Sequence, residues 1–264
     1  MTDAGQVTSN AAEVYDEFFL PALFSAWAPR VVAAAHLAPG MDVLDVACGT
    51  GVLTLAARAA VSPGGKAVGL DANPGMLAVA RSKAPDVKWH EGSAEALPFA
   101  PECFDAVVSQ FGLMFFGDKT AALRQMWRVL KPGGHLAIAV WSALGEAPGY
   151  ARMTALLGRL FGDGVANQLR APYSLGDPEA FGQLVARAGI TEPVIEWMPG
   201  EAHFPSIRSW IHTDVRGWTL SGELDDEQFE RLVREAEREL AGLVAADGSV
   251  RFDHPALLAT ATKP

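Results

Sequence analysis

The sequence contains very little cysteine and an excess of acidic over basic side chains. Cys48 and Cys103 are the two cysteines among 264 residues, which excludes a disulfide framework and leads us to expect a reducing compartment. Lys and Arg number 21 against 31 Asp and Glu, and the resulting net charge of −10 disfavours binding to the phosphate backbone of nucleic acids. The sequence also lacks an apolar run approaching the ~18–20 residues of a membrane span, and its first residues do not resemble a secretory signal. We therefore expect a cytoplasmic protein that neither spans a membrane nor binds nucleic acid.

Apolar residues, by contrast, are plentiful. Half of the side chains are hydrophobic, which is enough to bury a full core. Five short apolar runs alternate with helical segments, at Met41–Val46, Lys66–Leu70, Val87–His90, Phe104–Ser109 and His135–Trp141. This alternation predicts right-handed βαβ units and a parallel sheet covered on both faces. Asp118 is the expected N-cap of the helix before the fifth run.

The pattern becomes less regular after Trp141. We expect a helix at Asp177–Ala188, a strand at Pro193–Phe204, an amphipathic helix at Asp225–Val244 and a last strand at Ala256–Thr262. Residues 205–250 then form an insertion before the last strand, well placed to cover the carboxyl edge of the sheet.

A glycine-containing loop, Cys48–Gly51, follows the first predicted strand. Glycines allow a ligand to approach the backbone closely, and the helix that follows offers free N–H groups. Asp71 ends the second predicted strand, 20 residues after Gly51, where an acid can accept hydrogen bonds from both hydroxyls of a ribose. The loop alone is also compatible with a simple strand–helix turn, but its pairing with Asp71 favours a nucleoside site.

The residues around the loop distinguish between nucleoside ligands. Thr54 stands where a dinucleotide site usually has its third glycine, and Asp45 precedes the loop. A carboxylate repels a pyrophosphate, whereas it attracts an ammonium or sulfonium centre. The sequence therefore favours a cationic nucleoside over NAD.

Five motifs in the chain resemble, in order, those of the class I S-adenosylmethionine-dependent methyltransferases, in particular the small-molecule group that includes the ubiquinone/menaquinone C-methylases. The motifs are Val43–Gly51, Gly69–Leu77, Gly92–Phe99, Phe104–Gln110 and Arg128–Gly134. The resemblance covers most of the chain from Tyr15 to Trp141. It implies an α/β fold: a Rossmann-like, doubly wound, mostly parallel seven-stranded sheet with helices on both faces and an antiparallel last strand.

The resemblance also implies how the chain is divided. Residues 1–264 would form a single class I methyltransferase domain, in which residues 1–40 are an N-terminal helical lid and residues 41–142 the cofactor-binding core. Residues 143–264 would be a C-terminal part that contains the substrate-covering insertion at about 205–250.

The implied cofactor is S-adenosyl-L-methionine, with S-adenosyl-L-homocysteine as product. In the family, the loop holds the methionine part, the acid matching Asp71 holds the ribose, and the residue matching Met76 lies against the adenine. The residues implied to contact the cofactor are Tyr15, Asp45, Ala47, Cys48, Gly49, Thr50, Gly51, Asp71, Ala72, Met76, Ser93, Ala94, Glu95, Ser109, Gln110 and Phe111. Many relatives have Asp at the position of Ser93, so we expect weaker cofactor affinity here, because a hydroxyl accepts a hydrogen bond less strongly than a carboxylate.

The sequence does not single out a catalytic base. A sulfonium methyl is already activated, so its in-line displacement depends mainly on positioning, and a base helps only if the acceptor must lose a proton. His203 and His212 are weak candidates, for which a packing or surface role is the alternative. We expect no metal site, because the histidines and cysteines lack the spacing of metal ligands.

Several aromatic residues raise the question of an acceptor pocket. Trp210 and Trp218 either line such a pocket or fill the core. Phe111 is expected to face the active site, and residues 114–116 to belong mainly to the core.

These inferences favour methyl transfer to a small, apolar or aromatic acceptor by a monomer or a homodimer. In one alternative, the protein binds S-adenosylmethionine but does not transfer its methyl group, as in a cyclase-like enzyme. The others are a NAD-binding oxidoreductase and a non-enzymatic nucleoside-binding protein.

Overall fold

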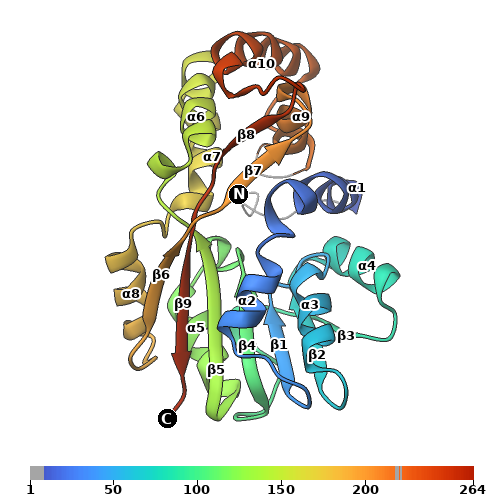
Figure 1. The fold of residues 1–264 in the computed structure, drawn as a ribbon, viewed down its shortest axis with the longest axis vertical. Helices are drawn as coiled ribbons and strands as arrows, with labels where there is room; N and C mark the ends of the chain where they lie inside the picture. The colour runs from blue at the N-terminus through green and yellow to red at the C-terminus, as the bar shows by residue number, and fades with distance from the viewer. Residues whose placement is uncertain (1–8, 218–219, 221) are drawn as a thin grey trace.

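A seven-stranded sheet in the order β3-β2-β1-β4-β5-β9-β6 runs through the computed structural model, which describes residues 9–217, 220 and 222–264 (Figure 1). Five neighbouring strands are parallel: β1 (Asp42–Val46), β2 (Lys66–Asp71), β3 (Lys88–Glu91), β4 (Phe104–Gln110) and β5 (Leu130–Trp141). The last strand, β9 (Ala256–Thr262), lies antiparallel between β5 and β6 (Val194–Met198). The predicted doubly wound sheet with its antiparallel last strand is confirmed.

Helices cover both faces of this sheet, as the apolar strand pattern requires. On one face, α2 (Ala28–Ala34) packs against α3 (Val52–Val61), near α4 (Pro74–Lys83), and on the other face α5 (Lys119–Val129) packs against α8 (Pro178–Arg187) (Figure 1). Between these two layers of helices, the valines of β1 and the alanine and valines of β4 are fully buried, so the core lies in the centre of the sheet.

Side chains at two helix starts fix the turns that precede them. Asp118 accepts a hydrogen bond from the backbone N–H of Ala121 at 2.9 Å, which confirms it as the N-cap of α5. Asn73 caps α4 by accepting from Gly75 N at 2.8 Å, and Pro74 supplies a first helical residue that has no N–H to satisfy. The cap of α4 places residues 71–73 at the end of β2 in a defined turn.

A helical cover lies over the carboxyl ends of the parallel strands (Figure 1). It consists of α6 (Pro148–Phe161), α7 (Asp163–Arg170), α9 (Ile207–Gly217), α10 (Asp226–Glu239) and a two-stranded ribbon of β7 (Glu201–Phe204) and β8 (Val250–Asp253). The insertion predicted at residues 205–250 is thus part of this cover. Short helical turns join the elements: η2 (Ala94–Ala96), η3 (Leu113–Phe115), η4 (Leu144–Glu146), η5 (Ala171–Tyr173) and η6 (Ala241–Leu243).

The single strand predicted at Pro193–Phe204 is wrong, because the chain makes two strands in different sheets there. β6 belongs to the main sheet and β7 to the ribbon, and Pro199 and Gly200 separate them. A Cβ at Gly200 would lie 2.4 Å from the carbonyl oxygen of His254, so the backbones cross too closely for another side chain. Proline has no N–H to continue the ladder, and the strand therefore ends at this crossing.

The N-terminal segment begins with α1 (Ser9–Val14) and continues as a π-helix, η1 (Tyr15–Phe24). Pro21 lies inside the π-helix, where its missing N–H prevents a regular α-helical hydrogen bond. Lys83 Nζ on α4 lies 2.6 Å from Asp16 Oδ1, which ties this segment to the core beside the carboxyl end of β2.

The division into lid, core and C-terminal part stays a prediction. Within the described ranges, no helix combines the length and apolar character needed to cross a membrane.

The contact between α6 and the ribbon gives a test of how the cover is held. A Cβ at Gly149 would lie 2.5 Å from the ring of Phe252, which is buried in β8. We expect Gly149→Ala to lower the free energy of unfolding by about 1–3 kcal/mol, since the ring would have to shift against Tyr150 and Trp210, on which it packs. A Cβ at Gly145 meets nothing within 4 Å, so Gly145→Ala is the matched control. Urea denaturation checks both, and equal effects would contradict the packing.

Candidate nucleoside-binding site

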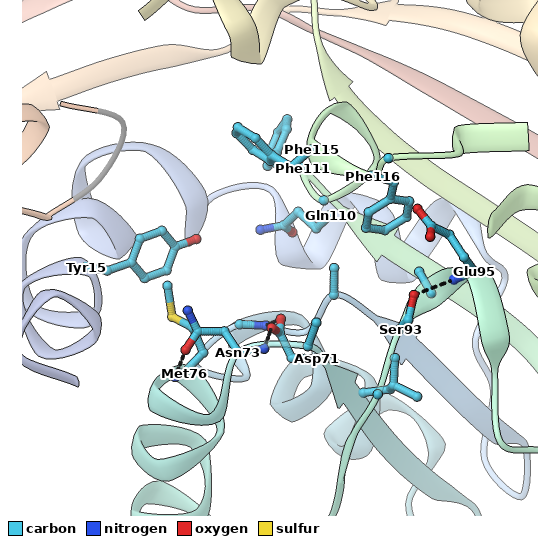
Figure 2. A pocket seen from close by; sticks show the side chains of 18 of the residues that line it. Tyr15, Asp71, Asn73, Met76, Ser93, Glu95, Gln110, Phe111, Phe115 and Phe116 are labelled. Carbon is cyan, nitrogen blue, oxygen red and sulfur yellow. Dashed lines mark hydrogen bonds between the residues drawn. The ribbon is translucent and has the colours of Figure 1, made fainter. Parts of the chain in front are cut away.

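A pocket of about 430 Å³ opens at the carboxyl ends of β1, β2 and β4, beneath the cover (Figure 2). It is lined by Tyr15, Phe24, Ala47, Gly49, Leu70, Asp71, Ala72, Asn73, Met76, Gly92, Ser93, Ala94, Glu95, Gln110, Phe111, Gly112, Phe115, Phe116 and Gly117. Ligands of open α/β sheets bind at this edge, next to the strands where the sheet order reverses. In this sheet, that place is between β1 and β4.

The loop after β1 has a tightly constrained backbone. Ala47, Gly49 and Gly51 all adopt positive φ angles, of 59°, 54° and 93°. A Cβ at Gly51 would lie 2.6 Å from the indole of Trp89, and one at Gly112 would lie 2.5 Å from the Cβ of Ala47. The loops after β1 and β4 therefore touch, and glycine is required where they meet.

Asp71 joins the ends of β1 and β2. Its Oδ2 accepts a hydrogen bond from Gly49 N at 2.8 Å, and its Oδ1 accepts from Asn73 N at 2.8 Å. Burial raises the pKa of this carboxyl, although the backbone amides of Asn73, Gly49 and Ala72 act in the opposite direction. A carboxylate offers about four lone-pair sites, so Asp71 can still accept hydrogen bonds from a ligand in the pocket.

Asp45 lies below the loop and is only 1% exposed. Its Oδ2 accepts from Thr54 Oγ1 at 2.6 Å, while its Oδ1 makes no hydrogen bond. Burial raises the pKa of Asp45 to about 7, and the hydrogen bond from Thr54 limits that rise. Burial and the charges of Asp71, Asp16 and Asp45 raise the pKa of Tyr15 far above its usual value, so its hydroxyl stays neutral.

The electrostatic character of the pocket follows from these groups. Asp71 and Glu95 line it, Asp45 lies beneath it, and none of its lining residues is Lys, Arg or His. An anion such as a pyrophosphate would find no cationic partner among these side chains, whereas a cation is attracted by the carboxylates. The arrangement therefore suits a positively charged or neutral nucleoside.

One end of the pocket is formed by the turn after β3. Ser93 Oγ accepts from Glu95 N at 3.1 Å (Figure 2). Glu95 Oε1 accepts from Asp118 N at 2.7 Å. Glu95 is thus engaged in holding the start of α5. Ser93 keeps its hydroxyl proton for donation and one further lone pair for acceptance. Met76 contributes an apolar surface on the opposite wall (Figure 2).

Residues after β4 form an aromatic wall of the pocket, in which Phe116 lies next to Glu95 (Figure 2). Gln110 Nε2 donates to the carbonyl oxygen of Phe24 at 3.1 Å, and its Oε1 is buried without a hydrogen bond. Phe111 has a positive φ of 56°, which is rare for a bulky residue and directs its ring along this wall. Phe115 and Phe116 also line the pocket, so the interpretation of residues 114–116 as mainly core is wrong for these two and right for the buried Met114.

Most residues proposed for the cofactor come together in this pocket. Lining it are Tyr15, Ala47, Gly49, Asp71, Ala72, Met76, Ser93, Ala94, Glu95, Gln110 and Phe111. Asp45, Cys48, Thr50, Gly51 and Ser109 do not line it. They form the layer beneath, in which Thr50 Oγ1 and Ser109 Oγ are buried without hydrogen bonds.

Other lining residues were missed by the sequence reasoning. They are Phe24, Leu70, Asn73, Gly92, Gly112, Phe115, Phe116 and Gly117. Asn73, Gly92 and Gly112 stand next to predicted residues in the motifs, so neighbouring positions could have identified them. Phe24 comes from the π-helix, which no sequence pattern indicated.

The two candidate bases lie away from the pocket. His203 is exposed on β7, because strand alternation places Ala202 and Phe204 inward instead. His212 packs between Phe18 and Phe229, with ring centroids 5.8 and 6.5 Å away. Trp210 is fully buried in the cover, whereas Trp218 lies outside the described residues. Among those that are described, no three His, Cys, Asp or Glu side chains cluster as metal ligands would.

Comparisons with known proteins agree with this geometry. Residues 43–134 match the family described as "Methyltransferase domain". A demethylmenaquinone methyltransferase of Chlorobaculum parvum is 49% identical over 111 residues, which are 40% of this chain and 45% of that protein, so the chain spans less than half of that relative's length. An uncharacterized protein of Mycobacterium tuberculosis is 30% identical over 256 residues, 89% of this chain and 86% of that protein.

The fold is also similar to that of solved structures. Phosphoethanolamine N-methyltransferase 2 of Haemonchus contortus, solved with phosphomonomethylethanolamine and S-adenosylhomocysteine, superposes with a TM-score of 0.61 at 20% identity. The superposition covers 97% of this chain and 58% of that protein. At this level of identity, the similarity extends to the fold alone.

The buried Asp45 predicts a pH dependence of stability. The native protein keeps the Asp45 proton up to about pH 7, whereas the unfolded chain loses it near the usual value of 3.8. Between about pH 4 and pH 7 the unfolded state therefore binds fewer protons, and this group's contribution to the free energy of unfolding falls as the pH rises. Asp45→Asn removes this ionisable group and with it the fall in the free energy of unfolding. As the pH rises across this range, the variant should therefore become more stable relative to the wild type, by a few kcal/mol at most. Urea denaturation at several pH values measures the difference, and a difference independent of pH would contradict the burial argument.

Proposed function

Because the chain belongs to the class I S-adenosylmethionine-dependent methyltransferases, we propose that it transfers a methyl group from this cofactor to a small-molecule acceptor. The observation that carries the proposal is the carboxylate of Asp71 at the end of β2, hydrogen-bonded to the glycine loop and facing a pocket without basic side chains. Relatives named for the methylation of menaquinone precursors support an aromatic acceptor.

The residues present fit S-adenosylmethionine. Asp71 offers an acceptor for the ribose hydroxyls, and Met76 and Ala94 offer apolar surfaces for the adenine. Gln110 Oε1 is a buried acceptor without a hydrogen bond, suited to an ammonium group. Gly49 leaves the space above the loop open, since a Cβ there would meet nothing within 4 Å. The acidic surroundings suit the sulfonium charge.

The chain's own residues contribute position and desolvation. When bound, the cofactor supplies a methyl group already activated by the sulfonium. The glycine loop and Asp71 hold the nucleoside in place, and Tyr15 and Phe24 of the N-terminal segment cover the pocket. Phe111, Phe115 and Phe116 exclude water from the end where Gln110 lies, so that the reactants meet in a fixed orientation and a low dielectric.

The proposal includes the environment of the protein. Cys48 and Cys103 are free thiols, which supports a cytoplasmic location. The net charge of −10 supports a small molecule rather than nucleic acid as the acceptor.

Calorimetric titration with S-adenosylmethionine and S-adenosylhomocysteine tests the cofactor directly. We expect both to bind the wild type, and Asp71→Asn to weaken binding by about 1.5–3 kcal/mol, because a charged acceptor of the ribose hydroxyls is lost. This corresponds to about a 10- to 150-fold increase in Kd. Asp86→Asn is the matched control, since Asp86 is an exposed acid paired with Arg58 and lies outside the pocket.

Circular dichroism shows whether Asp71→Asn still folds, because Asp71 also anchors the loop. If the variant folds and binds both ligands with unchanged affinity, the ribose is held by other residues. Binding of neither ligand by the wild type would overturn the function. Binding without any transfer of labelled methyl to a panel of acceptors would indicate the cyclase-like alternative.

A further inference from the structure

The indole of Trp89 packs against the glycine loop, although Trp89 does not line the pocket. Trp89 lies on β3, the strand at one edge of the sheet (Figure 1), and pairs in register with Gly69 of β2. The residue is half-buried and lies outside the sequence motifs that point to the cofactor. A side chain at the edge of the sheet thus reaches the loop after β1, two strands away.

Glycine at position 69 makes room for this ring. A Cβ at Gly69 would lie 2.5 Å from Cε3 and 2.5 Å from Cζ3 of Trp89, so the indole lies directly on the backbone of β2. Gly69 does not have a positive φ, and its lack of a side chain is therefore needed for space and not for backbone conformation. A glycine inside a strand commonly marks such a close approach. The indole thus lies across β2 in the gap that Gly69 leaves.

The far edge of the same ring meets the loop. A Cβ at Gly51 would lie 2.6 Å from Cη2 of Trp89, and Gly51 is the N-cap of α3 with a φ of 93°. The N–H of Gly51 donates to the carbonyl oxygen of Cys48 at 2.9 Å, and its carbonyl oxygen accepts from Leu55 N at 2.9 Å. Gly51 therefore joins the turn of the loop to the first turn of α3, and the indole fills the space beside this junction.

The indole is itself held in one orientation. Its Nε1 donates to the carbonyl oxygen of Ala84 at 2.9 Å, and Ala84 is the C-cap of α4. Turning the ring about its side-chain bonds would break this hydrogen bond, and the backbone of β2 limits its movement on the other side. The loop therefore packs against a fixed surface.

On the premise of the proposed function, we propose that Trp89 is a positioning residue for S-adenosylmethionine, which holds the glycine loop in its binding conformation before the cofactor arrives. Trp89 acts through Gly51, because its own side chain lies outside the pocket. The loop combines positive φ angles at three positions with two glycines, whose backbones lose much conformational freedom when they are ordered. A loop that is ordered in advance spares the cofactor this loss, and so raises its affinity.

Two contacts then hold the loop, one on each of its glycines. Asp71 accepts from Gly49 N at 2.8 Å, and Trp89 packs on Gly51. Substitution of Asp71 also removes the proposed ribose acceptor, so it does not separate holding the loop from binding the ligand. Substitution of Trp89 separates the two, because Trp89 does not face the ligand.

Hydrogen–deuterium exchange of the ligand-free protein measures the order of the loop without any cofactor. In Trp89→Phe, the shorter ring does not reach Gly51 and the hydrogen bond to Ala84 is lost. We expect the amides of residues 49–51 to exchange about 10-fold faster than in the wild type, the factor that corresponds to freeing the backbone of about one residue. Trp127→Phe is the matched control, since Trp127 is a half-buried tryptophan of α5 on the opposite face of the sheet.

Calorimetric titration with S-adenosylhomocysteine measures the consequence for binding. We expect Trp89→Phe and Gly69→Ala each to raise Kd about 10-fold, the first by removing the ring contact and the second by displacing the indole. In the Trp89→Leu background the ring atoms nearest to the added Cβ are absent, so Gly69→Ala should there raise Kd by less than about 2-fold. Equal effects of Gly69→Ala in both backgrounds would contradict the contact.

The outcomes distinguish this proposal from the proposed function. A folded Trp89→Phe that is less stable in urea, but keeps the loop exchange and the Kd of the wild type, would overturn the positioning role. If Trp89→Phe does not fold, loop exchange in Gly69→Ala decides instead: faster exchange supports the role, and unchanged exchange overturns it. Failure of S-adenosylhomocysteine to bind the wild type would count against the proposed function, whereas an unchanged loop in the ligand-free variants counts against the role of Trp89 alone.

Discussion

The hydrogen bond from Gly49 N to Asp71 Oδ2 is the interaction on which the site depends. It joins the loop after β1 to the end of β2, and so fixes a backbone in which Ala47, Gly49 and Gly51 all have positive φ. The loop in turn sets the position of Gly112, whose backbone touches Ala47. Three neighbouring strand ends are therefore held in one arrangement by a single carboxylate, which also faces the ligand pocket.

Burial determines the charge of the groups around this arrangement. Asp45 and Asp71 are buried and no basic side chain lines the pocket, so burial raises the pKa of both carboxyls; a cation bound beside them would stabilise their ionised forms. On the far side of the Phe111–Trp141 stack, burial lowers the pKa of His254 to about 3 and raises the pKa of Asp214. Burial thus favours the neutral form of all four groups, Asp45, Asp71, His254 and Asp214.

The sequence was most informative where structure depends on local chemistry. The glycine loop, the place of Asp71 and the Asp118 cap follow from residue types at fixed spacings, and the structure has them as predicted. The parallel strands end within about one residue of the predicted positions, whereas β5 begins at Leu130 and not at His135. Features that depend on tertiary packing were not visible. Phe115 and Phe116 face the pocket because the turn at Leu113–Phe115 follows the contact of Gly112 with Ala47. His254 is a single residue after a short strand, and its contacts with Tyr173 and Trp141 arise only when β8 and β9 meet the cover.

The most direct test of the account is a crystal structure of the protein grown with S-adenosylhomocysteine. We expect the nucleoside to lie in the pocket between β1, β2 and β4, with its ribose hydroxyls on the carboxylate of Asp71 and its sulfur towards Gln110 and Phe111. Density for the ligand at another place, or a ribose that makes no contact with Asp71, would contradict it.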